Sequence, residues 1–451
     1  MHDLSTTVAA IATAPGRGGI GCVRLSGPDA LRIAQRLCRG RRAGPVLPDS
    51  HPRFVTFVDG AGHAIDHGFV VAFASSRSYS GEPSVELWAH GSPAVLEALV
   101  AGAAAAGAEI AMPGEFTYRA VRHGRLDLVR AEAIRDLIAA RTPYQARVAF
   151  AQLEGSAARR LAPLREALAE LLARTEASIE FSEESDTRQD AERLAADLAA
   201  ALSDVERLRE DARRGRIVQQ GARVALVGAT SVGKSSLFNR LLGVDRAIVS
   251  EVPGTTRDTI EESLTMNGIP LTLVDTAGLR VPRGSIEAEG VRRARVAAGQ
   301  ADLLVAVIDA SRMPEPDESE AIARLREGTR TIVVANKSDL HGPERQDPPW
   351  DEALPVSAMT GVGIDALRSA IQAALDGPAV GDDPVITDLR QAKALDDAAA
   401  ALHRARDAAP LGDEIVVEEL REALAALAAI TGELANEDLY DRIFSTFCIG
   451  K

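Results

Sequence analysis

A glycine-rich stretch after an apolar run offers the clearest chemistry in the sequence. Residues 228–235 read Gly-Ala-Thr-Ser-Val-Gly-Lys-Ser, the spacing of a loop that wraps phosphate groups between a strand and a helix. Gly228 and Gly233 let the backbone turn so that successive N–H groups point at phosphate oxygens. We expect Lys234 to reach the β- and γ-phosphates and the Ser235 hydroxyl to bind Mg²⁺. The alternative is an ordinary tight turn that carries an exposed lysine.

Two further motifs indicate which nucleotide this loop would bind. An apolar run over 271–275 ends in Asp275, which can support the Mg²⁺ shell, and Gly278 follows with an N–H that can meet the γ-phosphate. A second apolar run over 331–335 leads into Asn336, Lys337 and Asp339. The Asp339 carboxylate can accept from both N1–H and N2–H₂ of guanine, a paired contact that adenine cannot supply.

A third segment completes the base site. Ser357 and Ala358 follow an apolar residue and would place backbone N–H groups near guanine O6. Four ordered elements at these spacings predict a GTP-binding domain.

Composition sets the broad class of the protein. A chain of 451 residues predicts about two to four domains. Its three cysteines, Cys22, Cys38 and Cys448, are odd in number and far apart, which disfavours a disulfide framework and predicts a reducing, cytoplasmic location. The first residues do not read as a basic and then apolar leader. No run approaches the roughly 18 apolar residues of a membrane span, so we expect no stable membrane insertion.

The formal net charge of −14 disfavours a broad phosphate-binding face of the kind that gives non-specific nucleic-acid affinity. A local basic groove remains compatible with it. Two interpretations are open for the arginines at 119, 122, 125 and 130: they form such a groove, or they lie on a solvated basic helix face.

Residue patterns divide the chain into four segments. Residues 1–120 mix short β-like runs with turns, and residues 121–215 are rich in Ala, Leu, Arg and Glu at helical spacing. Residues 216–375 alternate strands with helices, and residues 376–451 begin with a Gly- and Pro-rich linker and return to a helical pattern. We predict a multidomain α/β protein with an N-terminal α+β domain, a long-helix domain, and an inserted Ras-like P-loop G domain whose sheet is mainly parallel.

Four blocks outside the G domain carry a resemblance to a known family. They are residues 15–27, residues 79–91, residues 113–133 and the C-terminal Cys-Ile-Gly-Lys of residues 448–451. Together with the nucleotide motifs, they resemble the MnmE (TrmE) family of bacterial tRNA-modification GTPases, in the TrmE-Era-EngA-like group, over nearly the whole chain.

The resemblance implies a folate site in the N-terminal domain. That domain is similar to folate-binding one-carbon domains and would bind a tetrahydrofolate derivative between the protomers of a homodimer. Arg24, Glu86, Arg125 and Lys451 match the positions that contact it, and Arg125 replaces the family's usual lysine. Arg24 and Glu86 both lie inside expected strands. They are equally compatible with a position on the solvent face of an antiparallel sheet. Cys448 is open to two interpretations, a catalytic thiol or a buried or merely structural cysteine near the folate.

The resemblance also implies the reaction. The family acts with a flavoprotein partner, MnmG (GidA), in a heterotetrameric or larger complex that modifies C5 of the wobble uridine (U34) of tRNA. Folate supplies the carbon of a (carboxymethyl)aminomethyl group, FAD on the partner handles redox, and the partner carries most of the tRNA-binding surface. The alternative is a regulatory or ribosome-assembly GTPase without modification chemistry. A membrane-remodelling GTPase would need a membrane segment or a basic amphipathic helix.

The hydrolysis machinery carries over with one departure. Leu279 stands where many small GTPases have a water-orienting glutamine, and the family instead uses a glutamate that aligns with Glu287, with Glu289 as a close second. Lys234 and Gly278 complete the catalytic set. In the family a K⁺ ion supplies positive charge when two G domains pair face to face. Its ligands match Ser231, Ser250, Val252 and Thr255, where Ser231 replaces the family's asparagine with a shorter hydroxyl arm.

The GTP and Mg²⁺ ligands follow from the motifs and the resemblance together. Ser235 and Thr256 would bind Mg²⁺. The residues expected to contact GTP are Ser231, Val232, Gly233, Lys234, Ser235, Ser236, Ser250, Thr255, Thr256, Asp275, Gly278, Asn336, Lys337, Asp339, Ser357 and Ala358.

Overall fold

The computed structural model describes residues 3–40, 50–180, 191–244, 260–275, 299, 301–340, 352–375, 383–433 and 435–451. The chain forms two compact units. The first comprises Met1–Arg135, Gln152–Arg165 and Arg421–Lys451, and the second comprises Asp136–Ala151 and Glu166–Leu420. The four predicted segment boundaries remain predictions.

A seven-stranded sheet forms the first unit, in the order β3-β4-β5-β6-β2-β1-β7. Neighbouring strands are antiparallel except for the parallel pair of β1 and β7. The strands are β1 (Val8–Ile11), β2 (Gly18–Ser26), β3 (Cys38–Arg39), β4 (Arg53–Val58), β5 (Ala64–Phe73), β6 (Ser84–Gly91) and β7 (Glu109–Ile110).

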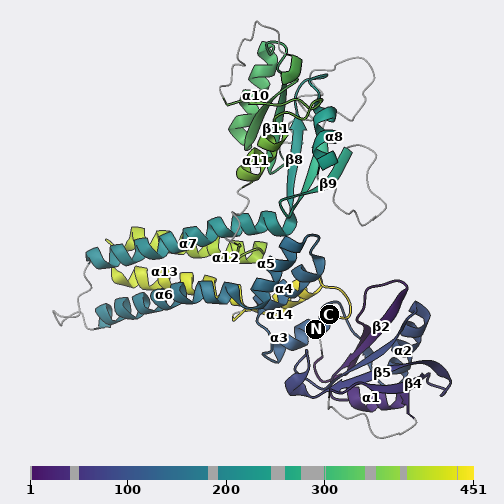
Figure 1. Cartoon of the computed structure of the whole chain (residues 1–451). Helices are drawn as coiled ribbons and strands as arrows, with labels where there is room; N and C mark the ends of the chain where they lie inside the picture. Colours follow the sequence, from purple (N-terminus) through teal and green to yellow (C-terminus); the bar gives the residue numbers. More distant parts are fainter. Residues whose placement is uncertain are drawn as a thin grey trace. The chain divides into compact units, whose positions relative to one another are not determined.

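One face of this sheet is covered by α1 (Ala30–Leu37) and α2 (Pro93–Ala105) (Figure 1). Alternate residues of β2 and β6 enter that core, among them Val23, Leu25, Val85 and Leu87. Because side chains alternate along a strand, Arg24 and Glu86 lie on the opposite face. The register places these two residues directly opposite each other on adjacent strands.

Short helices attach the C-terminal segment to the first unit. The unit holds η1 (Ser75–Arg77), α3 (Glu115–Arg122), the part of α4 (Leu128–Ala139) up to Arg135, and α14 (Glu437–Phe444). Tyr118 and Leu128 pack against Phe444 and Phe447 in a buried cluster. The last residues of the chain are therefore held against its N-terminal part by apolar contacts.

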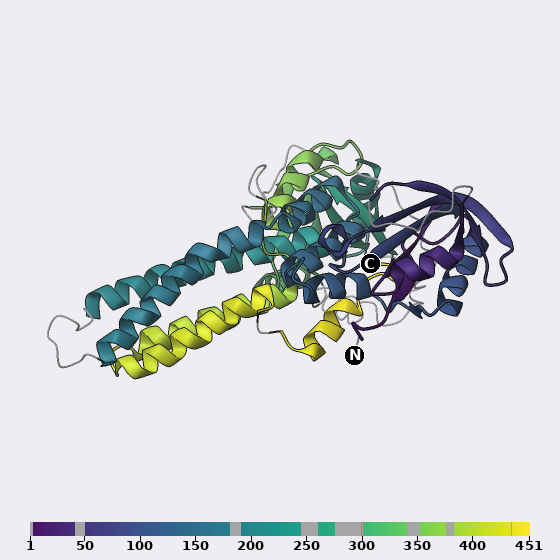
Figure 2. The same ribbon diagram turned by 90° about the horizontal axis from the view of Figure 1, so that it is seen from below.

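Long helices make up the rest of the helical part: α5 (Pro143–Leu153), α6 (Ser156–Glu180), α7 (Ala191–Gln220), α12 (Leu389–Ala408) and α13 (Asp413–Thr431). The helical spacing predicted for residues 121–215 produces a leucine stripe on α6, where Leu161, Leu164, Leu168 and Leu171 are buried. The four longest helices run along one another in both views (Figures 1 and 2). Helix α7 precedes the G domain and α12 follows it. Gly215 on α7 lets the segment before α12 approach closely, since a Cβ there would lie 1.8 Å from the Ile386 carbonyl oxygen.

A six-stranded sheet forms the G domain, in the order β13-β12-β11-β8-β10-β9. All pairs are parallel except β9 with β10. Its strands are β8 (Ala222–Val227), β9 (Ile260–Met266), β10 (Ile269–Asp275), β11 (Leu303–Asp309), β12 (Thr331–Asn336) and β13 (Leu354–Pro355), with α8 (Lys234–Val244), α10 (Pro316–Gly328), η2 (Ser338–Leu340) and α11 (Ile364–Ala374). The predicted fold class is confirmed.

The topology brings the predicted motifs to one edge. Strands β8, β10, β11 and β12 are parallel, so their carboxyl ends meet at the same side of the sheet, where α/β proteins bind ligands. Among the helices that the structure describes, none is long and apolar enough to cross a membrane.

Candidate functional site

The phosphate loop joins β8 to α8, as the sequence predicts. Gly228 has φ of +148°, and a Cβ there would lie 2.2 Å from the Val307 carbonyl oxygen. Gly233 has φ of +95°, and its Cβ would lie 2.3 Å from Asn336 Nδ2. Both positions need glycine because the conformation is left-handed and the neighbouring strands approach closely.

Lys234 is folded into this loop. Its ammonium group donates to the Gly228 carbonyl at 2.8 Å and to the Ala229 carbonyl at 2.5 Å, and only 6% of the residue is exposed. Burial lowers the pKa of Lys234, and the nearby Asp275 carboxylate opposes that shift. The alternative of a tight turn with an exposed lysine is wrong, because the cation is enclosed by the loop.

Ser235 and Asp275 meet at the base of the loop. The Ser235 hydroxyl donates to Asp275 Oδ2 at 2.8 Å, and Asp275 is 1% exposed at the end of β10. Two hard oxygen ligands thus converge beside the lysine, and oxygen ligands of this kind suit Mg²⁺.

Asn336 joins the phosphate loop to the predicted base loop. Its Nδ2 donates to the Val232 carbonyl at 2.9 Å, and its Oδ1 accepts from the Ala358 N–H at 3.0 Å. The side chain is almost fully buried, so these hydrogen bonds fix the two loops relative to each other. Ser357 is also buried, and its hydroxyl accepts from the Thr360 N–H at 3.0 Å.

Lys337 and Asp309 form a pair that the motifs did not include. Lys337 has φ of +66°, and its ammonium lies 2.6 Å from Asp309 Oδ2. Burial opposes ionisation of Asp309, but the hydrogen bonds from Lys337 and Ser311 hold its pKa below the ordinary value. The signal for Asp309 was its place at the end of an apolar strand run, as for Asp275. Asp339 lies exposed on η2.

The remaining predicted nucleotide residues fall into two groups. Ser231, with φ of +65°, and Ser236 are exposed on the loop and on α8. The others lie outside the described residues: Ser250, Val252, Thr255, Thr256, Gly278, Glu287 and Glu289.

A second polar site lies on the face of the first sheet that α1 and α2 leave uncovered. Arg24 Nη2 lies 2.9 Å from Glu86 Oε1, and the other Glu86 oxygen accepts from Trp88 Nε1 at 3.2 Å. Arg24 Nη1 also donates to the Gly450 carbonyl at 3.3 Å. The side chains of Arg24 and Glu86 are only 15% and 17% exposed, so most of each side chain is covered although the face carries no helix.

Aromatic rings frame the cations of this second site. The Arg24 guanidinium lies 5.5 Å from the Tyr79 ring centroid and 5.6 Å from that of Phe116. The Lys451 ammonium lies 5.6 Å from the same Tyr79 ring. Burial lowers the pKa of Lys451 and the positive Arg24 adds to this effect, while Glu86 opposes it.

Three of the four predicted folate residues, Arg24, Glu86 and Lys451, thus lie close together. The fourth, Arg125, contacts the loop that carries Tyr79. Arg125 Nη2 donates to the Ser78 carbonyl at 3.4 Å, one residue before Tyr79. Cys448 is exposed, and its carbonyl accepts from the Gly114 N–H at 3.3 Å. The interpretation of Cys448 as a buried cysteine is wrong.

Comparison with known proteins identifies the family. Residues 7–125 match the family profile described as "GTP-binding protein TrmE N-terminus", and residues 128–448 match "MnmE helical domain". Three relatives named tRNA modification GTPase MnmE are similar over nearly their full length. That from Symbiobacterium thermophilum is 43% identical over 99% of each chain. That from Azoarcus sp. is 43% identical over 98% of each chain, and that from Thermus thermophilus is 42% identical over 100% of each.

This chain belongs to the MnmE family of tRNA modification GTPases. It is therefore a GTPase.

For Arg119 of this MnmE-family chain, both interpretations of the arginine-rich segment are wrong. The side chain is fully buried, where it contacts Glu82 at 3.0 Å, Glu115 at 2.9 Å and the carbonyls of Asp3 and Thr6. It is part of neither a basic groove nor a solvated face. It neutralises two buried carboxylates beneath the loop that carries Tyr79.

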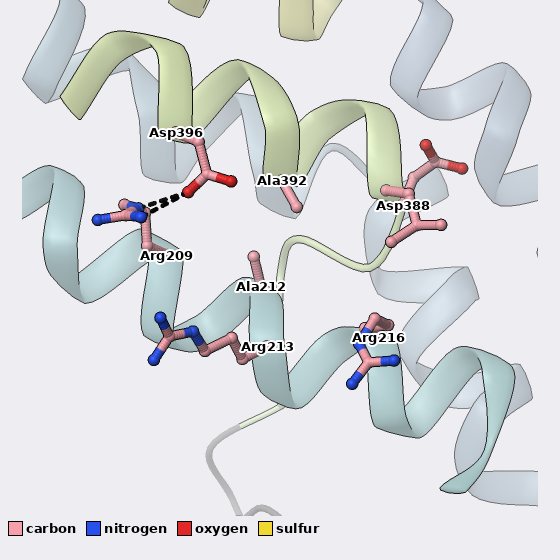
Figure 3. Close-up of a pocket in the computed structure, with 8 residues that line it drawn as sticks. Arg209, Ala212, Arg213, Arg216, Asp388, Ala392 and Asp396 are labelled. Carbon is pink, nitrogen blue, oxygen red and sulfur yellow. Dashed lines mark hydrogen bonds and ion pairs between the residues drawn. The ribbon is translucent and has the colours of Figure 1, made fainter. Parts of the chain in front are cut away.

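A pocket of about 240 Å³ lies between α7 and α12 of the MnmE-family helical domain (Figure 3). Arg209, Arg213 and Arg216 line it, yet Arg209 pairs with Asp396 and Arg216 with Asp302. Two of its three cations are thus neutralised within the protein, and we assign the pocket no chemistry.

Proposed function

We propose that this chain is the GTP-hydrolysing subunit of a complex that modifies C5 of the wobble uridine (U34) of tRNA. It would add a folate-derived (carboxymethyl)aminomethyl group together with the FAD-bearing flavoprotein MnmG, which supplies most of the tRNA-binding surface. The observation that carries the proposal is the cluster of Arg24, Glu86 and Lys451. This cluster joins two strands to the C-terminal tail.

The chemistry of this cluster suits a tetrahydrofolate derivative. The Glu86 carboxylate can accept from the amino groups of a pterin, while Arg24, Lys451 and Arg125 can meet carboxylates of the glutamyl part. The planar ring of Tyr79, which is only partly buried, already lies against a cation and can equally stack on a heterocycle. Bound folate would supply the one-carbon unit. The residues of this chain bind and orient it, and the tail limits access of water.

The GTP site supports the proposed metal ligands. Ser235 would bind Mg²⁺ directly, with Asp275 in its shell and Thr256 completing it. Glu287 would orient the attacking water, with Lys234 and the Gly278 N–H stabilising charge on the γ-phosphate. Ser231, Ser250, Val252 and Thr255 would hold a K⁺ ion when two G domains pair.

An exposed aromatic row supports the proposed homodimer. Phe54, Phe69 and Trp88 are opposite one another on β4, β5 and β6, and they are 66%, 48% and 37% exposed. Contiguous exposed apolar surface of this kind commonly marks an interaction site. The row shares its sheet face with Glu86, so a partner protomer on it would lie beside the proposed folate site.

Nucleoside analysis of tRNA tests the proposal. In a strain that lacks this chain, we expect the C5-substituted wobble uridines to disappear by mass spectrometry and to return with the intact gene. A strain with the Glu86→Gln variant should show the loss while its purified protein still hydrolyses GTP. Unchanged wobble uridines in the deletion strain would overturn the proposal and favour a regulatory or ribosome-assembly GTPase.

A further inference from the structure

Arg240 connects the phosphate-binding helix to the predicted base loop. It lies on α8, and its Nε donates to the Ala358 carbonyl at 3.0 Å while its Nη2 donates to the Met359 carbonyl at 2.6 Å. The two acceptors follow directly after Ser357, more than a hundred residues along the chain. None of the nucleotide motifs includes this arginine.

Beyond the buried Ser357, the loop that Arg240 contacts is exposed. Met359 is 85% exposed, whereas Ser357 is fully buried. Gly361 turns the chain with φ of +90°, and a Cβ there would lie 3.4 Å from Arg240 Nη2. A charged donor on two successive carbonyls is therefore a strong local restraint on residues 358–359.

The two hydrogen bonds also set the direction of the peptide N–H groups. All described peptide bonds are trans, so the N–H of each peptide unit points opposite to its carbonyl. Because Arg240 holds the Ala358 carbonyl, the Met359 N–H points away from α8. A cation on the carbonyl also polarises that peptide unit and makes its N–H a stronger donor.

We propose that Arg240 is a positioning residue for guanine recognition, which orients and strengthens the Met359 N–H, next to Ala358 in the loop that would meet guanine O6. This inference rests on the proposal that the loop of Ser357 and Ala358 meets the guanine base. Helix α8 also carries Lys234 and Ser235, so one rigid element would set both the phosphate contacts and the base contact. The Arg240 side chain touches the loop rather than the nucleotide, and its effect is exerted through the loop.

Equilibrium binding to the full-length protein tests the inference with three ligands. GDP has O6, inosine diphosphate keeps O6 but lacks the 2-amino group, and 6-thio-GDP replaces O6 with a poorer acceptor. For Arg240→Ala we expect GDP and inosine diphosphate to bind about tenfold more weakly, which corresponds to about 1.4 kcal/mol. Affinity for 6-thio-GDP should fall much less, because the lost interaction is the one made to oxygen.

Two variants control for general damage. Arg240→Lys keeps a cation that can reach one carbonyl and should restore part of the GDP affinity. Arg324→Ala removes a helical arginine that pairs with Glu320 on α10, and it should leave all three affinities unchanged. The thermal midpoint of each nucleotide-free variant reports whether its fold is kept.

The outcomes separate the inference from the base-site proposal. Equal weakening of all three ligands by Arg240→Ala, or no weakening of GDP, would overturn the role of Arg240 while the base site stands. If the unaltered protein binds GDP and 6-thio-GDP equally, the proposed base site fails and the inference fails with it.

Discussion

At the scale of single residues, several charged side chains are held away from water. Arg119 satisfies two buried carboxylates, and Lys234 is enclosed by the carbonyls of its own loop. Arg24 and Glu86 pair on the open face of the sheet beneath the C-terminal tail. Buried charges are tolerated only when they are paired and hydrogen-bonded, so each of these side chains depends on specific partners.

Arg119→Ala tests this dependence. We expect it to lower the free energy of unfolding of the first unit by about 3–5 kcal/mol, because Glu82 and Glu115 remain buried without their counter-charge. Denaturant unfolding followed by circular dichroism measures the loss. Arg122→Ala is the matched control on the same helix, where an exposed pair with Glu437 contributes about 0–1 kcal/mol. Equal effects of the two substitutions would contradict the role of burial.

Glu287→Ala addresses the proposed catalytic glutamate. We expect nucleotide affinity to be kept and the hydrolysis rate at saturating GTP to fall about 10²–10⁴-fold, the usual range for a residue that orients or activates water. Single-turnover phosphate release measures the rate, and Glu289→Ala serves as the comparison. Normal hydrolysis by the Glu287 variant together with a defect in the Glu289 variant would transfer the role to Glu289.

Cys22 predicts a pH dependence of stability. Burial raises the pKa of this thiol from 9.0 to about 12, with Glu86 adding to the shift and Arg24 opposing it. Above pH 9 the unfolded chain loses the thiol proton while the folded chain keeps it, so the free energy of unfolding falls as pH rises. We expect this contribution, about 1.4 kcal/mol per pH unit above 9, to vanish in Cys22→Ala. Denaturation at pH 8 and pH 10 measures it, and the exposed Cys448→Ala is the control that should behave like the unaltered protein.

At the scale of elements, the C-terminal tail is the segment whose place depends most on other elements. Helix α14 is capped by Asn436, whose side chain accepts from the Leu439 N–H, and it packs through Phe444 on α3. Beyond it, Gly450 has φ of +93°, and a Cβ there would lie 2.2 Å from the Ile11 carbonyl oxygen. The tail therefore fits against the end of β1 only with glycine at this position.

Removal of Cys448–Lys451 should impair tRNA modification and spare GTP turnover. The reason is that Lys451 and the Gly450 carbonyl belong to the proposed folate site and not to the nucleotide loop. Gly450→Ala should give the same pattern, since it displaces the tail without removing its charge. Modified-nucleoside analysis and phosphate release measure the two activities. Equal loss of both would argue against a separate folate role for the tail.

At the scale of the whole molecule, the G domain is an insertion between two long helices. Helices α7 and α12 flank it in sequence and pack together along their length. Pairing of two G domains, if it supplies the charge that a catalytic arginine supplies elsewhere, would make hydrolysis depend on the cation present.

Turnover in K⁺ against Na⁺ at equal ionic strength and saturating Mg²⁺ tests that dependence. We expect stimulation by K⁺, because the serine hydroxyl at 231 and the proposed ligands at Ser250, Val252 and Thr255 offer oxygen to the ion. Ser231→Asn, which restores the family's residue, should increase the stimulation. Equal rates in the two salts would contradict a K⁺-dependent mechanism and direct the search to an arginine from a partner.

The sequence by itself determined the features that depend on neighbours along the chain. The phosphate loop and the acid at Asp275 could be read from strand–turn–helix spacing, because glycine, lysine and serine must follow one another in that order to wrap phosphate. The leucine stripe of α6 could be read from its period for the same local reason. The family resemblance could also be recognised from short blocks of the sequence.

Only the tertiary structure decided which distant residues meet. Arg24 and Glu86 are 62 positions apart, and Arg24 and Gly450 are 426 apart, so their contacts depend on strand register and on the return of the chain after the G domain. Arg240 meets Ala358 across 118 positions through the same kind of closure. Arg119 looked like one of several helix arginines, and its burial follows from the loop and strands that cover it. Local periodicity contains no information on such pairings, because strand order and helix packing fix them after the local elements have formed.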